Sequence, residues 1–84
     1  MTTIYTLTDE ISRQKWAYTS LKAMFLHEDN DLYLYLNIQQ YYRILKKNDG
    51  KHPISIESFT IEKGYAFNVE DVKKANQEGG VANE

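Results

Sequence analysis

Six polar side chains in residues 37–51 have the types and the spacing to contact nucleic acid. Arginine and lysine pair with phosphates, and glutamine hydrogen-bonds to base edges or sugars. The candidate contacts are Gln39, Gln40, Arg43, Lys46, Lys47 and Lys51. A structural alternative explains the same cations, because lysine and arginine near a helix C-terminus complement the helix dipole and solubilise its outer face.

Residues 37–51 also predict the helix that would carry these side chains. Apolar residues recur with the i, i+3, i+4, i+7 spacing of one helix face, at Ile38, Tyr41, Tyr42 and Leu45. Asn37 is a favourable N-cap, Gln40 completes a capping box, and Gly50 stands where a left-handed C-cap is expected. We expect the apolar face to point inward and the basic side chains to gather on an uncovered flank.

The charge of the chain is distributed unevenly. The whole sequence has 10 basic and 12 acidic residues, a net charge of −2, whereas residues 37–51 hold four basic residues and one acidic residue. The basic balance typical of nucleic-acid-binding domains is therefore confined to this segment. Acidic residues gather at Glu28, Asp29 and Asp31 and again near the C-terminus. Any contact with nucleic acid is thus expected from the one basic helix.

The sequence has no pattern that predicts catalysis, a cofactor or a metal site. It contains no cysteine, two histidines (His27 and His52) and no glycine-rich phosphate-binding loop. No nucleophile is marked by a neighbouring base. His27 with Glu28, Asp29 and Asp31 is a weak candidate for a divalent ion, although a solvated helix end explains the same residues. We therefore expect a protein that is not an enzyme and holds no cofactor or metal.

The N-terminal residues predict a β-hairpin. Residues 1–8 alternate and are rich in β-branched types, which indicates a strand. The polar residues 9–14 would form the connection and residues 15–19 the return strand. In that strand Trp16 and Tyr18 would share one face.

A short helix and a link of ambiguous conformation follow the hairpin. Ser20 can cap the helix, whose core-facing residues would be Leu21, Met24 and Phe25. Residues 31–36 alternate leucine and tyrosine, so a strand, an extended link and an early helical turn are all compatible with them. We favour the extended link, in which Leu34 or Leu36 would act as a hydrophobic staple, with Tyr41 as the partner of Leu36.

The remaining strand-forming residues lie in residues 54–67. Ile54 and Ile56 alternate with polar residues, and the phase of the alternation then changes, so we expect a bulge or turn near Glu57 and Ser58. Lys63 and Gly64 predict a second tight turn or bulge.

One α+β domain is predicted over residues 1–75. Its order would be β-β-α-α-β, with an extra strand or hairpin as an alternative, and two helices would cover one face of a small antiparallel sheet. Asn68, with Asp71 three residues later, would cap a last helical turn, and residues 76–84 would form a disordered tail. The sequence lacks the features of a membrane span or a secretion signal, so we expect a cytoplasmic protein with no membrane partner.

Residues in both predicted helices and in the first and last predicted strands are similar to those of a known family. They are Ile4-Tyr5, Thr19-Ser20-Leu21-Lys22, Ile38, Tyr41, Arg43, Ile44, Leu45, Lys46 and Lys63-Gly64-Tyr65. Over residues 4–67 the chain resembles the small modular DNA-binding repeats attached to homing endonucleases, and short proteins of phages and mobile elements. The resemblance implies a short helix pair, similar to a helix-turn-helix, that touches DNA.

Functions from two classes fit this sequence. The first is a small, phage-like binding module that contacts nucleic acid through residues 37–51. The alternative is a protein-interaction module, an inhibitor or adaptor, that uses acidic patches and the tyrosines Tyr33, Tyr35, Tyr41, Tyr42 and Tyr65. Homodimerisation through an edge strand or a tyrosine patch is a third hypothesis.

Overall fold

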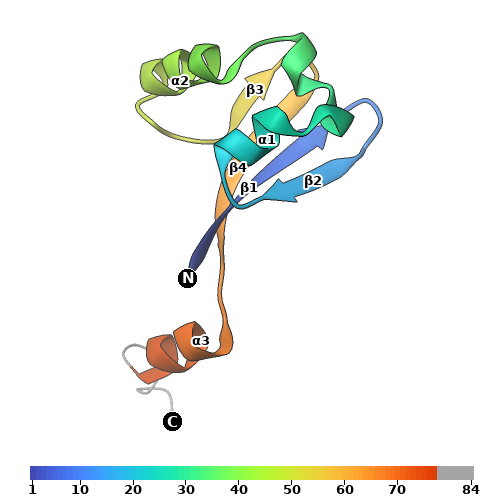
Figure 1. Ribbon diagram of the computed structural model, residues 1–84. Helices are drawn as coiled ribbons and strands as arrows, with labels where there is room; N and C mark the ends of the chain where they lie inside the picture. Colours follow the sequence, from blue (N-terminus) through green and yellow to red (C-terminus); the bar gives the residue numbers. More distant parts are fainter. Residues whose placement is uncertain (78–84) are drawn as a thin grey trace.

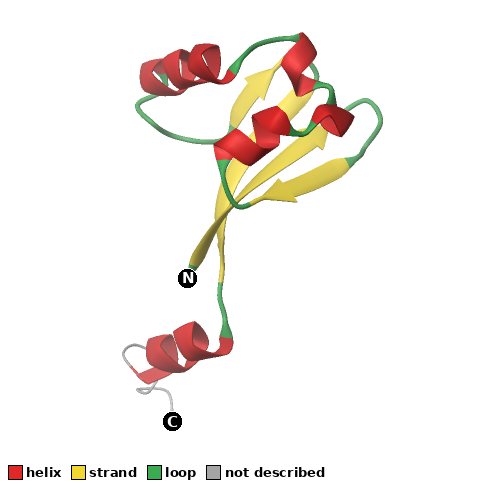
Figure 2. Cartoon of the chain, viewed as in Figure 1, coloured by secondary structure: helices red, strands yellow, loops and turns green. Residues whose placement is uncertain are grey.

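The computed structural model describes residues 1–77 and has the α+β fold that the sequence predicts. Four strands form one antiparallel sheet in the order β2-β1-β4-β3 (Figure 1). The strands are β1 (Thr2–Asp9), β2 (Lys15–Tyr18), β3 (Ile54–Ile56) and β4 (Phe59–Ala66). One face is covered by α1 (Leu21–Leu26), α2 (Ile38–Lys47) and the 3₁₀-helices η1 (Glu28–Asn30) and η2 (Leu32–Leu34) (Figure 2). A third helix, α3 (Val69–Ala75), follows the sheet.

The register of the sheet separates an apolar face from a polar one. Leu7 pairs with Trp16 on β2 and with Ile61 on β4, and Ile61 pairs in turn with Ile54 on β3. Because directly paired residues of antiparallel strands share a face, these four side chains form one row beneath the helices. Tyr18 lies two residues from Trp16 on the same face, as predicted.

The core is a single apolar cluster between this face and the helices. Its buried members are Leu7, Leu21, Met24, Leu32, Leu36, Tyr41, Ile54, Ile56, Phe59 and Ile61. Tyr41 is the largest side chain that is fully buried, and its ring centroid lies 5.4 Å from that of Phe25 on α1. One tyrosine of α2 therefore fixes that helix to the rest of the domain.

The change of phase expected near Glu57 and Ser58 is a two-residue turn between β3 and β4, in which Glu57 has a positive φ of 53°. The turn or bulge expected at Lys63 and Gly64 is wrong. Both residues lie inside β4, paired with Tyr5 and Ile4 of β1. Since β1 is long enough to pair with every residue of β4 as far as Ala66, the ladder overrides the local signal of the glycine.

The extended link favoured for residues 31–36 is also wrong, because η2 occupies the middle of it, at Leu32–Leu34. The cause is the buried side chain of Asn30, which accepts a hydrogen bond from the Leu32 backbone N–H at 2.9 Å. Asp31 takes a left-handed φ of 61°, and such local bonds from Asn favour turns over extended backbone. Leu34 is exposed, so it cannot be the hydrophobic staple. Leu36 is buried in the same apolar cluster as Tyr41, its predicted staple partner.

The N-terminal part of β1 and the C-terminal part of β4 extend beyond the helical layer, and the chain continues from β4 into α3 (Figure 1). The molecule is elongated as a result, with extents of 51 × 26 × 21 Å. As predicted, Asn68 caps α3 in a capping box with Asp71, and the Met1 ammonium pairs with the Asp71 carboxylate at 2.6 Å. Of the predicted tail over residues 76–84, Asn76 keeps helical backbone angles, and residues 78–84 lie outside the described residues. Within residues 1–77 no helix has the length and apolar character to cross a membrane.

Candidate nucleic-acid interface

Helix α2 is fixed at both ends by its own sequence. At the N-terminus the Asn37 side chain accepts from the Gln40 N–H, and the Gln40 side chain accepts from the Asn37 N–H, each at 2.8 Å. At the C-terminus the Gly50 N–H donates to the Leu45 carbonyl at 2.8 Å and the Asp49 N–H donates to the Lys46 carbonyl at 3.1 Å. These two bonds define a Schellman motif.

The predicted capping box is thus present, but the predicted C-cap needs a correction. The first left-handed residue after the helix is Asp49, with a φ of 57°, and Gly50 follows with a φ of 71°. Asp tolerates this conformation because its short polar side chain can hydrogen-bond locally. The helix therefore ends at Lys47, three residues before the glycine.

The inward face of α2 is narrower than the apolar pattern predicts. Tyr41 is fully buried and Ile38 and Leu45 are half-buried, but Tyr42 is 49% exposed and Ile44 is 38% exposed. The helix turns by about 100° per residue, so Tyr42 faces sideways when Tyr41 faces the core. Tyr42 was expected in the core-facing stripe, and it is instead available at the edge of the outer face.

The candidate contacts on α2 all lie on its outer side and are exposed: Gln39, Gln40, Arg43, Lys46 and Lys47. Helix geometry places Gln39, Arg43 and Lys46 within about 60° of one another, on the side opposite Tyr41. Lys47 and Gln40 lie about 40–60° further round the same side. Arg43 is separated by three or four residues from both lysines, which makes the three cations neighbours on the surface.

Lys51, the sixth candidate, lies in the loop after α2 and is also exposed. Asn48 holds its backbone, because the Asn48 side-chain amide donates to the Lys51 carbonyl at 2.6 Å and the Lys51 N–H donates to the Asn48 carbonyl at 3.0 Å. The loop therefore keeps Lys51 near the C-terminal end of α2. The structure brings all six predicted residues to one helix and its following loop.

None of these cations forms an ion pair with a carboxylate within residues 1–77. The ion pairs found there join Met1 to Asp71 and His27 to Asp29. The acidic residues of η1 lie at one end of the helical layer, and the C-terminal end of α2 lies at the other (Figure 1). The segment over residues 37–51 thus presents its positive charge at a distance from the acidic turn.

A partly buried contact beneath α2 could not be predicted from local spacing. The Tyr41 hydroxyl lies 2.6 Å from His52 Nε2, and the ring of Tyr5 packs edge-on against His52 at a centroid distance of 6.0 Å. Burial raises the pKa of Tyr41 far above its usual value, and burial, followed by the charge of Lys63, lowers the pKa of His52. At neutral pH the Tyr41 hydroxyl is therefore the donor and neutral His52 the acceptor.

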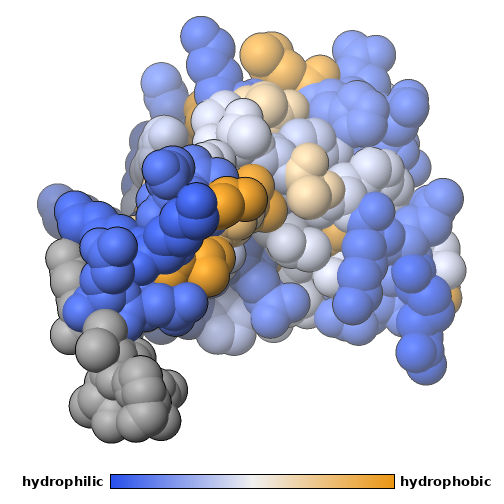
Figure 3. Space-filling model, turned by 90° about the horizontal axis from the view of Figure 1, so that it is seen from below, coloured by the Kyte–Doolittle hydropathy of each residue, from blue (hydrophilic) through white to orange (hydrophobic). Residues whose placement is uncertain are grey.

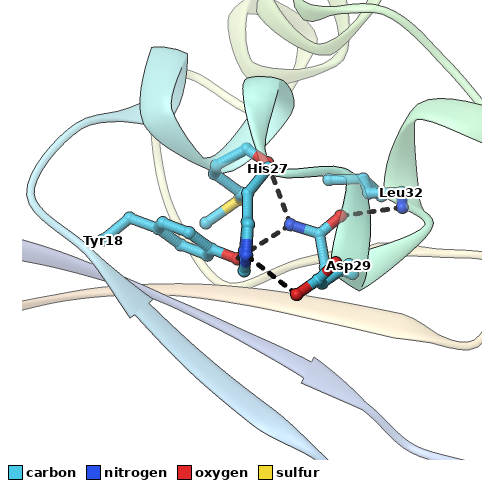
Figure 4. A network of polar contacts seen from close by, with 6 residues as sticks. Tyr18, His27, Asp29 and Leu32 are labelled. Atoms are coloured by element: carbon cyan, nitrogen blue, oxygen red, sulfur yellow. Dashed lines mark hydrogen bonds and ion pairs between the residues drawn. The ribbon is translucent and has the colours of Figure 1, made fainter.

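A second polar network surrounds the turn between α1 and η2 (Figure 4). The Asn30 amide donates to the Tyr18 hydroxyl and to the Met24 carbonyl, both at 2.9 Å. The Tyr18 hydroxyl lies 2.6 Å from His27 Nδ1, and His27 Nε2 lies 3.5 Å from an Asp29 oxygen. The Tyr18 hydroxyl thus contacts both Asn30 and His27, and the His27 ring lies between Tyr18 and Asp29.

This network includes two of the residues considered as a weak metal candidate, His27 and Asp29. His27 Nδ1 is occupied by Tyr18, and the Asn30 side chain organises the backbone of the turn. Within residues 1–77 no three His, Asp or Glu side chains converge as metal ligands would. The arrangement is suited to holding the α1–η2 connection in shape.

The geometry therefore yields one candidate interface, the outer side of α2 with Lys51. The resemblance to the modular repeats of homing endonucleases stays a prediction made from the sequence, because the chain has no match among protein-family models, curated proteins or solved structures.

Proposed function

We propose that the protein is a small, phage-like, non-enzymatic module that binds nucleic acid through the outer side of α2. The observation that carries the proposal is the position of the cations. Arg43, Lys46 and Lys47 share one exposed side of a capped helix, with no carboxylate partner among the described residues. Lys51 extends the same surface past the end of the helix.

The side chains divide into two roles. Arg43, Lys46, Lys47 and Lys51 would pair with phosphates, which fix the position of a protein on nucleic acid without reading its sequence. Gln39 would reach a base edge or a sugar. Gln40 uses its side-chain oxygen in the capping box, so only its amide N–H groups remain for a ligand. The major groove of DNA admits one α-helix, and α2 lies at the outer edge of the helical layer (Figure 1).

Fluorescence anisotropy with labelled, mixed-sequence duplex DNA at low salt tests the proposal. We expect a dissociation constant of about 10⁻⁴ M or lower, since non-specific binders reach about 10⁻⁴ to 10⁻⁶ M at physiological salt and bind more tightly at low salt. The triple variant Arg43→Ala, Lys46→Ala, Lys47→Ala should lose most of this affinity. A matched control, Lys73→Ala with Lys74→Ala, removes two exposed lysines from α3 and should bind as the wild type does.

The proposal fails if the folded wild-type protein does not bind at about 100 µM, or if the control and the triple variant lose affinity equally. Repeating the titration with single-stranded DNA and with RNA identifies the preferred form of nucleic acid. Because every substituted side chain is exposed, circular dichroism should show the same fold in all variants.

A second candidate function is binding of a protein partner. It is favoured by the exposure of Leu26, Tyr33, Leu34 and Tyr35, which lie on α1 and on the η2 segment away from the cations. Tyrosine is enriched among the residues that contribute most of the affinity of protein interfaces, where a desolvated aromatic side chain acts as an anchor. A protein partner would tolerate loss of the α2 cations and would be released by substitutions at Tyr33 or Tyr35.

A further inference from the structure

An apolar groove opens between α1 and the N-terminal end of α2. It has a volume of about 310 Å³, and its walls include Lys22, Phe25, Leu26, Tyr33, Leu36 and Ile38. Leu26 is 68% exposed at this site, although it is a large apolar residue. Lys22 is the one charged side chain that lines the groove, and it has no carboxylate partner among residues 1–77.

The opposite end of the molecule carries a segment whose apolar side chains are exposed among residues 1–77. We call residues 65–75 the arm; its exposed apolar side chains are Tyr65, Phe67, Val69 and Val72. No residue of α3 is buried, although a helix of seven residues is unstable in water without tertiary packing. Viewed from the α3 end, hydrophobic side chains are open to solvent beside the polar ones (Figure 3).

The arm lies far from the groove of its own chain. The groove belongs to the helical layer, whereas α3 lies at the far end of the long axis of 51 Å (Figure 1). Between them the chain is held straight by the pairing of Thr2, Thr3 and Ile4 with Ala66, Tyr65 and Gly64. Folding the arm back would break this ladder, so an occupant of the groove has to come from another molecule.

We propose that the arm of one copy docks in the groove of a second copy. The apolar side of the arm, formed by Phe67, Val69 and Val72, matches the apolar walls of the groove. The charges match as well, since Glu70 in the first turn of α3 has no cationic partner among residues 1–77 and Lys22 borders the groove. Each copy offers one arm and one groove, so a reciprocal exchange closes a two-fold dimer. This inference is independent of nucleic-acid binding.

Cross-linking of introduced cysteines tests the contact directly, because the natural chain has none. A Leu26→Cys protein is mixed with a mass-tagged Val72→Cys protein, and a short bismaleimide joins cysteines that lie close together. The expected product is the heterodimer that links position 26 to position 72. Ile11→Cys is the matched control, because Ile11 is 82% exposed in the β1–β2 connection and neither lines the groove nor belongs to the arm.

Each outcome decides the proposal. A heterodimer yield several-fold above the Ile11→Cys background supports arm-in-groove docking. Dominant Val72-to-Val72 products would show that two arms pair with each other and would overturn it, as would yields at background for every pair. Sedimentation velocity of cysteine-free proteins gives a second readout: wild type should associate as concentration rises, whereas Leu26→Asp and Val72→Asp should each stay monomeric. A wild-type protein that is monomeric throughout would overturn the proposal.

Discussion

The salt dependence of DNA binding should report how many of the α2 cations touch phosphates. Each phosphate contact on duplex DNA contributes about −0.9 to the slope of log Kobs against log salt concentration. Four contacts, from Arg43, Lys46, Lys47 and Lys51, predict a slope of about −3.6. Affinity should then fall about 150-fold between about 50 mM and about 200 mM salt. The Lys46→Ala variant should have a slope of about −2.7 and lose about 40-fold over the same range.

Anisotropy titrations at four or more salt concentrations measure these slopes. Lys73→Ala is the control, because Lys73 is an equally exposed lysine on α3 and its loss should leave the slope unchanged. The reasoning is refuted if the wild-type slope is shallower than about −1, since fewer than two phosphates would then be contacted. It is also refuted if Lys46→Ala and Lys73→Ala change the slope by the same amount.

Three further predictions concern the support of α2. Tyr41→Phe removes the hydroxyl that binds His52 and should lower the free energy of unfolding by about 1–2 kcal/mol in urea titrations, with the fold kept. Burial lowers the pKa of His52 in the folded state, so the unfolded chain binds more protons below about pH 6.5. Stability should therefore fall as pH drops through that value, and His52→Gln should reduce this loss in thermal melts from pH 7.5 to 5. Gln40→Glu keeps the capping box and favours the helix dipole, so the melting temperature should not fall, whereas added negative charge should weaken DNA binding.

Helix α2 could be predicted from the sequence because its signals are local. The capping box needs only Asn37 and Gln40, three residues apart, and the inward face needs only the spacing of Ile38, Tyr41 and Leu45. The cap of α3 at Asn68 could also be predicted from local signals. So could the turn at Glu57 and Ser58, where the phase of the alternation between apolar and polar residues changes. Such features depend on residues a few positions apart, and no tertiary contact has to be known.

The features that could not be predicted depend on distant partners. Asn30 reads as part of a polar turn, yet its side chain is buried and bonds to Tyr18, twelve positions away. Glycine at position 64 is typical of a turn, but Gly64 lies in β4 and pairs with Ile4 of β1. His52 and Tyr41 meet only because the loop after α2 returns to the sheet. Each of these contacts joins residues at least eleven positions apart, so the local pattern could not predict it.

Stability and binding are separable on α2 because the two faces of the helix have different roles. Tyr41 anchors the inward face by burial and by its contact with His52, whereas Arg43 and Lys46 contact no other described side chain through an ion pair. Substitutions of exposed side chains usually change the free energy of unfolding by less than about 0.5 kcal/mol. A loss of affinity in the Arg43 and Lys46 variants can therefore be assigned to the interface. Gln40 is the exception, because it caps the helix and borders the cations, so its effect on binding has to be measured beside its effect on stability.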